Sequence, residues 1–360
     1  MTMEKGITIY PGLDNTPEEN LSLLERAADY GFRRVLLALL LPYADRLRAK
    51  AELPNILRTA HRRKLDVIAA LSPEVMEVLH ITRLKLSAFH FMGISTLYLR
   101  HFSLANIAEL SHNHYNISIQ FDASKLTEDD VAELLEREPK VEQLDALHSF
   151  YPRLNSGMSE ENLIRKTVLL HRAGIKVGAF LPSAGRKRGP FGDGIPSMEM
   201  HRYFSADLAA RHYIAIGMDS VFFGDSLPTD EELAILSSLP DNDITLSANT
   251  CTKQEAVKRI LSHPFTAHID EARDSVRAIE GSWYLKRERA TVRPENTIER
   301  QVGHITVDNE TSPGYMGEVN IVKRPSAASP RVNVAAVIPE DETFLVNYIM
   351  PGRRFRLRLS

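Results

Sequence analysis

The chain has 360 residues, a formal net charge of −3, and 43% hydrophobic and 25% charged residues. This length typically gives two or three domains, and the composition is that of a globular protein with a sizeable core. The near-neutral charge provides no basic field for binding nucleic acid. A single cysteine, Cys251, excludes an intrachain disulfide and fits a reducing compartment. No segment has the pattern of a secretion signal or a transmembrane helix, so we expect a cytoplasmic protein without a membrane partner.

Short apolar segments alternate with amphipathic segments along the first two-thirds of the chain. The apolar segments predict strands at residues 7–10, 35–40, 67–71, 97–99, 117–121, 143–146, 177–181 and 220–223. The amphipathic segments predict helices at residues 17–30, 47–63, 73–89, 104–111, 128–137, 160–173, 199–216 and 230–236. Eight such units indicate an α/β fold, a TIM (β/α)8 barrel. A doubly wound open sheet is the alternative, but it usually has fewer strands and a GxGxxG turn that is absent after the first strand here.

The pattern changes after Pro240. Short alternating segments predict strands at residues 244–247, 265–269, 305–307, 319–321, 332–336, 343–348 and 355–359. One helix is predicted among them, at residues 253–262. We therefore predict a TIM-barrel domain at residues 1–240 and a smaller, mostly-β domain at residues 241–360.

Residues that directly follow the predicted barrel strands are the candidates for an active site, because barrel enzymes place their sites at the carboxyl ends of the strands. The loop after the seventh strand contains Arg186, Lys187 and Arg188, followed by glycine and proline. Barrel phosphate sites are frequently built there, and arginine offers a fork of donors to phosphate oxygens. A solvated cationic turn that binds nothing is the alternative.

Two carboxylates and one cluster of mixed residues stand out among these loops. Glu199 begins a predicted helix, where it is either a capping residue or a catalytic group. Asp122 ends the fifth strand, either facing the barrel mouth or forming a turn. The run His148-Ser-Phe-Tyr-Pro-Arg153 combines an imidazole, a phenol and a guanidinium, which favours ligand binding. The pair His112 and His114 lies at the opposite rim, so we predict no metal site.

Several motifs together resemble one known family, the MupG-like 6-phospho-N-acetylmuramidases of glycoside hydrolase family 170. The motifs are Ile7-Thr-Ile-Tyr-Pro11, Leu147-His-Ser-Phe-Tyr-Pro152, Ala179-Phe180, Arg188-Gly-Pro190, Gly194-Ile-Pro-Ser-Met-Glu199-Met-His-Arg202, Gly303-His-Ile-Thr-Val-Asp-Asn309 and Tyr315-Met-Gly-Glu318. The resemblance implies a TIM barrel followed by a cyclophilin-like β-barrel. It also implies a cytoplasmic hydrolase without a cofactor. The expected substrate is a phosphorylated amino-sugar disaccharide, MurNAc-6-phosphate-GlcNAc, made when a phosphotransferase system imports the sugar.

Glycoside hydrolysis usually requires two carboxyl groups, about 5 Å apart for retention and about 6.5–9.5 Å apart for inversion. We assign these roles to Glu199 and Asp122, with Asp225 in reserve. The residues predicted to bind the substrate are Tyr10, Arg100, His148, Tyr151, Arg153, Arg186, Arg188, His201 and Arg202. Among these, Arg186 and Arg188 are expected to hold the phosphate.

Three positions depart from the family pattern. The fourth strand ends in Arg100 where the family has aspartate, Asp122 replaces asparagine, and Ser149 replaces asparagine. The lost aspartate motivates two alternatives, a non-hydrolytic sugar-phosphate-binding paralogue and a 6-phospho-glycosidase for a different glycan. A Schiff-base lyase or aldolase is a third alternative, disfavoured because no predicted strand ends in lysine. A homodimer is compatible with the sequence.

Overall fold

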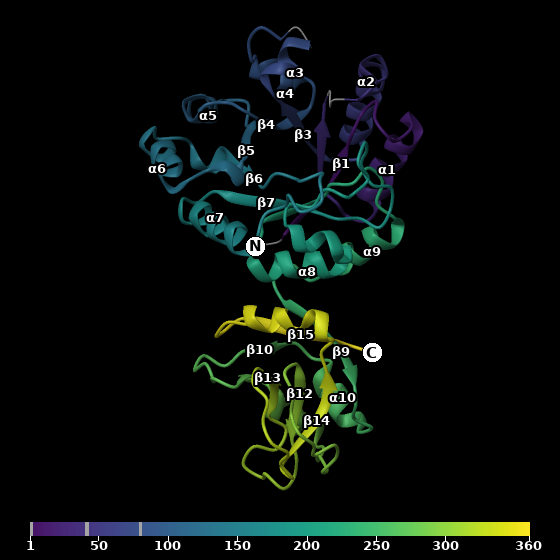
Figure 1. Cartoon of the computed structure of the whole chain (residues 1–360), viewed down its shortest axis with the longest axis vertical. Coiled ribbons are helices and arrows are strands. Elements are labelled where there is room, and N and C mark those ends of the chain that lie inside the picture. Colours follow the sequence, from purple (N-terminus) through teal and green to yellow (C-terminus); the bar gives the residue numbers. More distant parts are fainter. Residues whose placement is uncertain (1–2, 40–42, 79–80) are drawn as a thin grey trace. The chain divides into compact units, whose positions relative to one another are not determined.

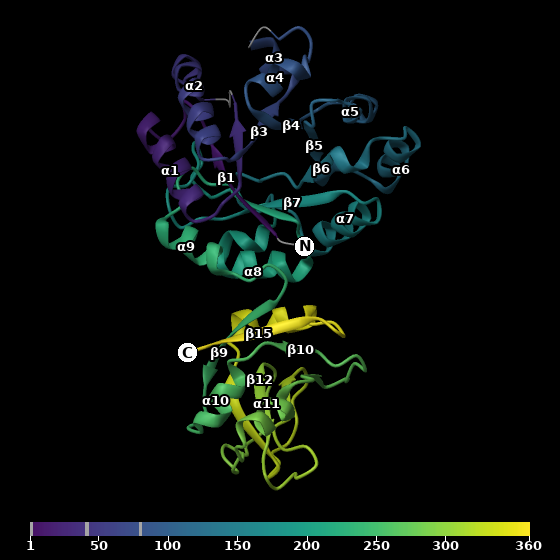
Figure 2. The same ribbon diagram turned by 180° about the vertical axis from the view of Figure 1, so that it is seen from behind.

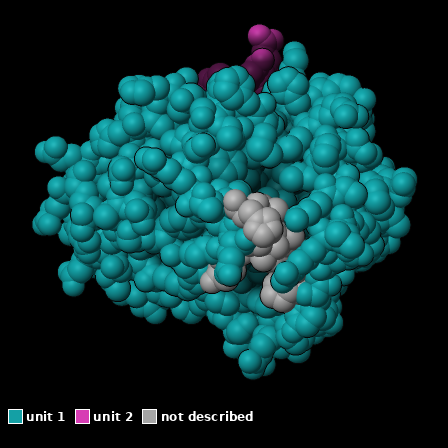
Figure 3. All heavy atoms as spheres, turned by 90° about the horizontal axis from the view of Figure 1, so that it is seen from above, with its two compact units in different colours: residues 1–213, 217–239 teal, residues 214–216, 240–360 magenta. Residues whose placement is uncertain are grey.

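The computed structural model describes residues 3–39, 43–78 and 81–360. The chain forms two compact units. The first contains residues 1–213 and 217–239 (teal in Figure 3), and the second contains residues 214–216 and 240–360. No helix in the described part of the chain is long and apolar enough to cross a membrane.

The first unit is a closed barrel of eight parallel strands (Figure 1). Each strand pairs with the next along the chain, and the eighth pairs with the first. The strands are β1 (Glu4–Ile9), β2 (Arg34–Ala38), β3 (Asp66–Leu71), β4 (Ile94–Leu99), β5 (Ser118–Asp122), β6 (Leu144–Leu147), β7 (Lys176–Leu181) and β8 (Ser220–Phe223). The predicted TIM barrel is therefore confirmed, strand by strand and in the predicted order. The last residue of the second predicted strand, Leu40, lies outside the described residues.

Helices cover the outside of this barrel (Figure 1). They are α1 (Pro17–Asp29), α2 (Arg46–Arg62), α3 (Pro73–Val78), α4 (Leu86–Phe91), α5 (Leu104–Ser111), α6 (Glu128–Glu136), α7 (Glu160–Arg172), α8 (Ala206–Ile216) and α9 (Asp230–Ser238). Capping boxes begin three of them: Thr16, Thr127 and Thr229 each accept a hydrogen bond from a backbone N–H of the first turn. These local signals explain why those helix starts could be predicted from the sequence.

Two predicted helices are wrong in their extent. The segment 73–89 forms two short helices, α3 and α4, and the stretch between them includes Ile81 and Thr82, whose β-branched side chains disfavour a helix. The segment 199–216 begins as a 3-10 helix, η3 (Glu199–Tyr203), and continues as α8. Ser205 separates the two, because its hydroxyl accepts a hydrogen bond from the backbone N–H of Leu208 (3.2 Å).

Aromatic and aliphatic side chains fill part of the barrel interior. One buried cluster consists of Leu36, Ile68, Tyr98, Leu147, Phe180 and Phe222. Phe150, three residues beyond the end of β6, packs against this cluster and also against Tyr10 and Ile195. Its ring meets Phe180 edge to face, with centroids 5.2 Å apart. Phe150 therefore closes the interior at the carboxyl end of the strands and forms the floor of the barrel mouth.

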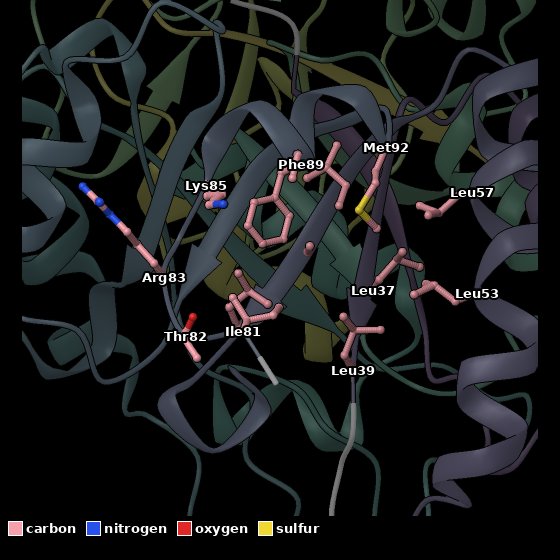
Figure 4. Close-up of a pocket in the computed structure, with 14 residues that line it drawn as sticks. Leu37, Leu39, Leu53, Leu57, Ile81, Thr82, Arg83, Lys85, Phe89 and Met92 are labelled. Atoms are coloured by element: carbon pink, nitrogen blue, oxygen red, sulfur yellow. The ribbon is translucent and has the colours of Figure 1, made fainter. Parts of the chain in front are cut away.

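An apolar cavity of about 360 Å³ lies outside the barrel wall (Figure 4). Leu37 from β2, Leu53 from α2 and Phe89 from α4 line it. The strand side chains that face this cavity alternate with those that face the barrel interior, as the two-residue period of a strand requires.

The second unit is mostly β, as predicted. Its seven-stranded sheet has the order β10-β15-β9-β14-β12-β13-β11. The strands are β9 (Ile244–Thr250), β10 (Phe265–Thr266), β11 (Ser275–Arg277), β12 (His304–Asp308), β13 (Val319–Val322), β14 (Val332–Val337) and β15 (Arg354–Leu359). Two helices, α10 (Glu255–Leu261) and α11 (Gly281–Glu288), are both visible in Figure 2.

Four features of this unit differ from the prediction. Residues 343–348 belong to a 3-10 helix, η4 (Glu340–Tyr348), in which the adjacent Leu345 and Val346 are both buried. The run Phe344, Leu345 and Val346 has the apolar, β-rich composition of a strand, so composition alone could not distinguish the two structures. The strand predicted at 265–269 ends at Thr266, and α11 and β11 were not predicted.

Candidate active site

The mouth of the barrel brings together residues from loops far apart in the sequence. Asp122 comes from the end of β5, Arg100 follows β4, Ser149 and Phe150 follow β6, and Arg188 follows β7. All of them lie at the carboxyl ends of strands, where TIM-barrel enzymes carry their active sites. Phe150 connects them, because the guanidinium groups of Arg100 and Arg188 both lie against its ring.

Asp122 is the carboxylate of this cluster. Its side chain is half-buried, and Oδ2 accepts a hydrogen bond from the hydroxyl of Ser149 (2.8 Å). Oδ1 accepts one from the backbone N–H of Ser124 (2.9 Å), whose hydroxyl in turn accepts one from the backbone N–H of Ser149 (2.7 Å). Within the described part of the chain no cation is paired with Asp122. Neutral donors thus hold the carboxylate in place while leaving it open to exchange protons with a ligand.

Asp225, the reserve catalytic residue, is enclosed by the loop after β7. It is fully buried and accepts hydrogen bonds from the backbone N–H groups of Ser183 and Arg188 (3.1 Å each). The ammonium of Lys187 lies 3.5 Å away. Burial raises the pKa of this carboxyl group, and the neighbouring Lys187 opposes that shift. These contacts indicate that Asp225 positions the loop.

Glu199 is also surrounded by donors. The guanidinium of Arg202 binds both carboxylate oxygens (2.8 Å each), and the backbone N–H groups of Asn155 (2.8 Å) and Gly157 (2.6 Å) bind one oxygen each. A Cβ atom on Gly157 would lie 2.5 Å from Glu199 Oε2, so the contact requires glycine. The hydrogen bonds from Arg202 lower the pKa of Glu199 to about 2. Glu199 therefore fastens the loop after β6 to η3, a positioning role.

Arg202 extends the same connection. Its guanidinium donates to the backbone carbonyls of Asp193 (3.1 Å), Gly194 (2.7 Å), Tyr151 (2.9 Å) and Arg153 (3.1 Å). One arginine side chain thereby joins the loop after β6 to the loop after β7. Because all these donors are engaged, the geometry assigns Arg202 to loop positioning.

Replacing Glu199 with glutamine tests this positioning role. The folded-state pKa of about 2 lies below the ordinary value of 4.5 for glutamate, so the ionised side chain stabilises the fold above about pH 4.5. We expect the variant to be about 1–2 kcal/mol less stable at neutral pH. This difference from the wild type should shrink as the pH falls toward 2. Thermal unfolding across this pH range measures it.

Limited proteolysis provides the second readout for the Glu199→Gln variant. We expect faster cleavage within residues 151–157, because the carboxylate no longer holds both backbone N–H groups. An unchanged melting temperature and cleavage rate, together with lost turnover, would instead support the catalytic role predicted from the sequence.

Arg186, expected to hold phosphate, is bound to a carboxylate of α1. Its guanidinium donates to both oxygens of Glu19 (2.6 and 2.8 Å) and to Oδ1 of Asn15 (2.9 Å). The hydrogen bonds from Arg186 lower the pKa of Glu19 to about 2. A phosphate group would have to displace this ionised carboxylate, so the geometry favours Arg188 over Arg186 as a ligand-binding residue.

The two predicted histidines are buried beneath the mouth. Nε2 of His148 contacts the hydroxyl of Thr167 on α7 (3.0 Å), and burial lowers the pKa of His148 to about 3. Nε2 of His201 contacts Nδ1 of His212 (2.9 Å), and burial lowers the pKa of His201 well below its ordinary value. Both imidazoles are neutral at physiological pH and face helices, which is typical of structural histidines.

The remaining predicted binding residues differ in their surroundings. Tyr10 is buried, and its hydroxyl donates to the carbonyl of Gly224 (2.5 Å). Tyr151 is half-buried near Asp122, and burial raises the pKa of its hydroxyl. Arg153 is exposed. Sequence reasoning did not single out Phe150, although it lies inside the quoted motif between His148 and Tyr151. Its position three residues beyond a buried strand was the available signal.

The described residues include no group of three or more histidine, cysteine, aspartate or glutamate side chains that could hold a metal ion. The groups available at the mouth are therefore a carboxylate, two guanidinium groups, hydroxyls and aromatic rings. This set can bind an anion and exchange a proton with a neighbouring oxygen.

Comparisons with known proteins cover both units. Residues 5–238 match the family model for the N-terminal part of 6-phospho-N-acetylmuramidase, and residues 244–358 match that for the C-terminal part. A solved structure of an uncharacterised B. cereus protein is 25% identical, with a TM-score of 0.87 over 99% of this chain and 100% of that one. A conserved Enterococcus faecalis protein of unknown function is 26% identical, with a TM-score of 0.70 over 99% of this chain and 96% of that one. No curated protein matches the sequence.

Proposed function

Because the chain belongs to the 6-phospho-N-acetylmuramidase family, a family of glycoside hydrolases, we propose that it hydrolyses MurNAc-6-phosphate-GlcNAc derived from peptidoglycan. The observation that carries this proposal is the family match across both units, with an accessible carboxylate at the barrel mouth. A cytoplasmic location goes with this substrate, because import by a phosphotransferase system would deliver the sugar already phosphorylated.

Asp122 is the residue we assign to acid–base catalysis. It has lone pairs open at the mouth, whereas Glu199 and Asp225 are enclosed by donors that hold loops in place. In the first step Asp122 would protonate the glycosidic oxygen, and in the second it would take a proton from water. The oxygen of the substrate's 2-acetamido group would form a bond to the anomeric carbon as the glycosidic C–O bond breaks, as in substrate-assisted glycosidases. Water would then attack the anomeric carbon and displace the acetamido oxygen, while Asp122 takes the water's proton.

A panel of disaccharides tests the proposed activity. Purified protein should hydrolyse MurNAc-6-phosphate-GlcNAc with a kcat/KM at least about tenfold above that for unphosphorylated MurNAc-GlcNAc, because charge-assisted hydrogen bonds to the phosphate are lost with the latter. A 6-phospho-disaccharide of glucose serves as a second comparison. Hydrolysis of the glucose compound alone would point to a different glycan. Binding without hydrolysis across the panel would support the non-hydrolytic paralogue.

A further inference from the structure

Two arginine side chains lie against one aromatic ring at the centre of the barrel mouth. The guanidinium carbon of Arg188 is 4.7 Å from the ring centroid of Phe150, and that of Arg100 is 5.9 Å from it. The ring belongs to the loop after β6, and the arginines follow β7 and β4. Three separate loops of the barrel thus bring two positive charges close to the ring of Phe150.

Arg188 is buried, and no carboxylate among the described residues forms an ion pair with it. The residue is 8% exposed, and its Nε atom has no hydrogen-bond partner among the described residues. Its side chain contacts the rings of Phe150 and Tyr10, the latter with its centroid 5.5 Å from the guanidinium carbon. Burying an unpaired charge is costly, and a cation–π contact offsets only a part of that cost. The free donors of Arg188 therefore indicate a binding role.

The backbone of Arg188 is held by hydrogen bonds, although its side chain forms no ion pair with the described residues. Its N–H donates to the buried carboxylate of Asp225 (3.1 Å), and the next residue, Gly189, donates to Asp14 (3.0 Å). In the same loop, Arg186 is bound to both oxygens of Glu19. The fold therefore neutralises one arginine of this loop and positions the other over the mouth with open donors.

Arg100 provides a second open guanidinium. It is half-buried, and no described carboxylate forms an ion pair with it, Asp122 included. Asp122 and Arg100 nevertheless both influence the buried hydroxyl of Tyr98. Burial raises the pKa of this hydroxyl; the negative charge of Asp122 raises it further, and the positive charge of Arg100 lowers it. Asp122 and Arg100 thus lie near the same hydroxyl group.

We infer that Arg100 and Arg188 bind a single phosphoryl group of the substrate between them, above Phe150 and beside Asp122. Arginine binds phosphate through two parallel N–H donors, and two arginines suit a dianion better than a singly charged carboxylate. The inference rests on the proposed function only for naming this group as the phosphate of a 6-phospho-sugar. It moves the phosphate from the Arg186 side of the loop to the centre of the mouth.

Binding of inorganic phosphate, measured by calorimetry on the full chain, tests this inference without requiring turnover. The variants are Arg100→Gln, Arg188→Gln and the double variant, with Arg172→Gln on the exposed end of α7 as the matched control. We expect each single substitution at the site to weaken phosphate binding at least tenfold. The double variant should lose less than the product of the two single effects, because both arginines bind the same anion. The control should bind like the wild type.

Several outcomes would overturn the inference. One is unchanged phosphate binding in both single variants. Another is a double variant whose loss of affinity equals the product of the two single losses. Binding of D-lactate instead of phosphate at these arginines would show a carboxylate site. If Arg188→Gln does not fold, Arg188→Lys replaces it in the calorimetry. Lysine should also weaken phosphate binding, because its ammonium lacks the two parallel N–H donors of a guanidinium. Phosphate binding that depends on both arginines, in a protein that cleaves no 6-phospho-disaccharide, would leave this inference standing and remove the proposed activity.

Discussion

Replacing Asp122 with asparagine is expected to lower kcat for MurNAc-6-phosphate-GlcNAc by about a thousandfold while changing KM little. Positioned general acid–base catalysis typically contributes between a hundredfold and ten-thousandfold to the rate. The amide has nearly the same shape as the carboxylate, so its oxygen can still accept the hydrogen bond from the backbone N–H of Ser124, while its NH2 group can donate to the hydroxyl oxygen of Ser149. It cannot, however, donate and retrieve the proton on which bond cleavage depends.

The control for Asp122→Asn is the same substitution at Asp129, an exposed residue in the first turn of α6. Asp129→Asn removes one negative charge from the same part of the chain and is expected to keep full activity. Steady-state kinetics and thermal unfolding of both variants separate chemistry from folding. An Asp122→Asn protein with wild-type kcat would contradict the acid–base assignment and return attention to Glu199.

The order of the barrel strands could be predicted because each strand is a short apolar segment, bounded by turn and helix-capping residues. That order also placed Asp122, Arg100 and Arg188 at the carboxyl rim, where the structure has them. The order of the strands along the chain can be read from the sequence without any knowledge of side-chain contacts. The same reasoning places residues on a rim but cannot tell which of them are neutralised there.

Neutralisation depends on contacts between distant segments, and here the sequence pattern was insufficient. Glu199 accepts hydrogen bonds from backbone groups of residues 155 and 157, and Arg186 is bound to Glu19, over 160 residues earlier in the chain. No local pattern encodes these pairs. Glu199 and Arg186 looked reactive in the sequence, but in the structure both are held by hydrogen bonds to distant segments. Phe150, by contrast, looked like an ordinary apolar residue.

The polar cluster at the opposite, amino end of the barrel leads to the second large effect, which is on stability. Arg34 at the start of β2 and Asp145 in β6 form an ion pair of 2.6 Å inside the barrel, with both side chains 9% exposed. Gln120 also donates to the same carboxylate oxygen (3.0 Å). Replacing Asp145 with asparagine leaves a buried guanidinium whose remaining ion-pair partner among the described residues is the half-exposed Glu4, 3.3 Å away, with the exposed Asp66 as a weaker negative charge nearby.

We expect Asp145→Asn to lower the free energy of unfolding by about 3–5 kcal/mol, which is typical of breaking a buried ion pair from one side. Chemical denaturation measures this loss. Asp66→Asn, at an exposed carboxylate of the same rim, is the matched control and should change stability by less than about 1 kcal/mol. A double variant, Arg34→Met with Asp145→Leu, removes both charges and should regain most of the lost stability, because no charge is then left unpaired in the barrel. If the double variant were less stable than Asp145→Asn, the destabilisation would come from packing around Phe222, over whose ring the Arg34 guanidinium lies, and not from the orphaned charge.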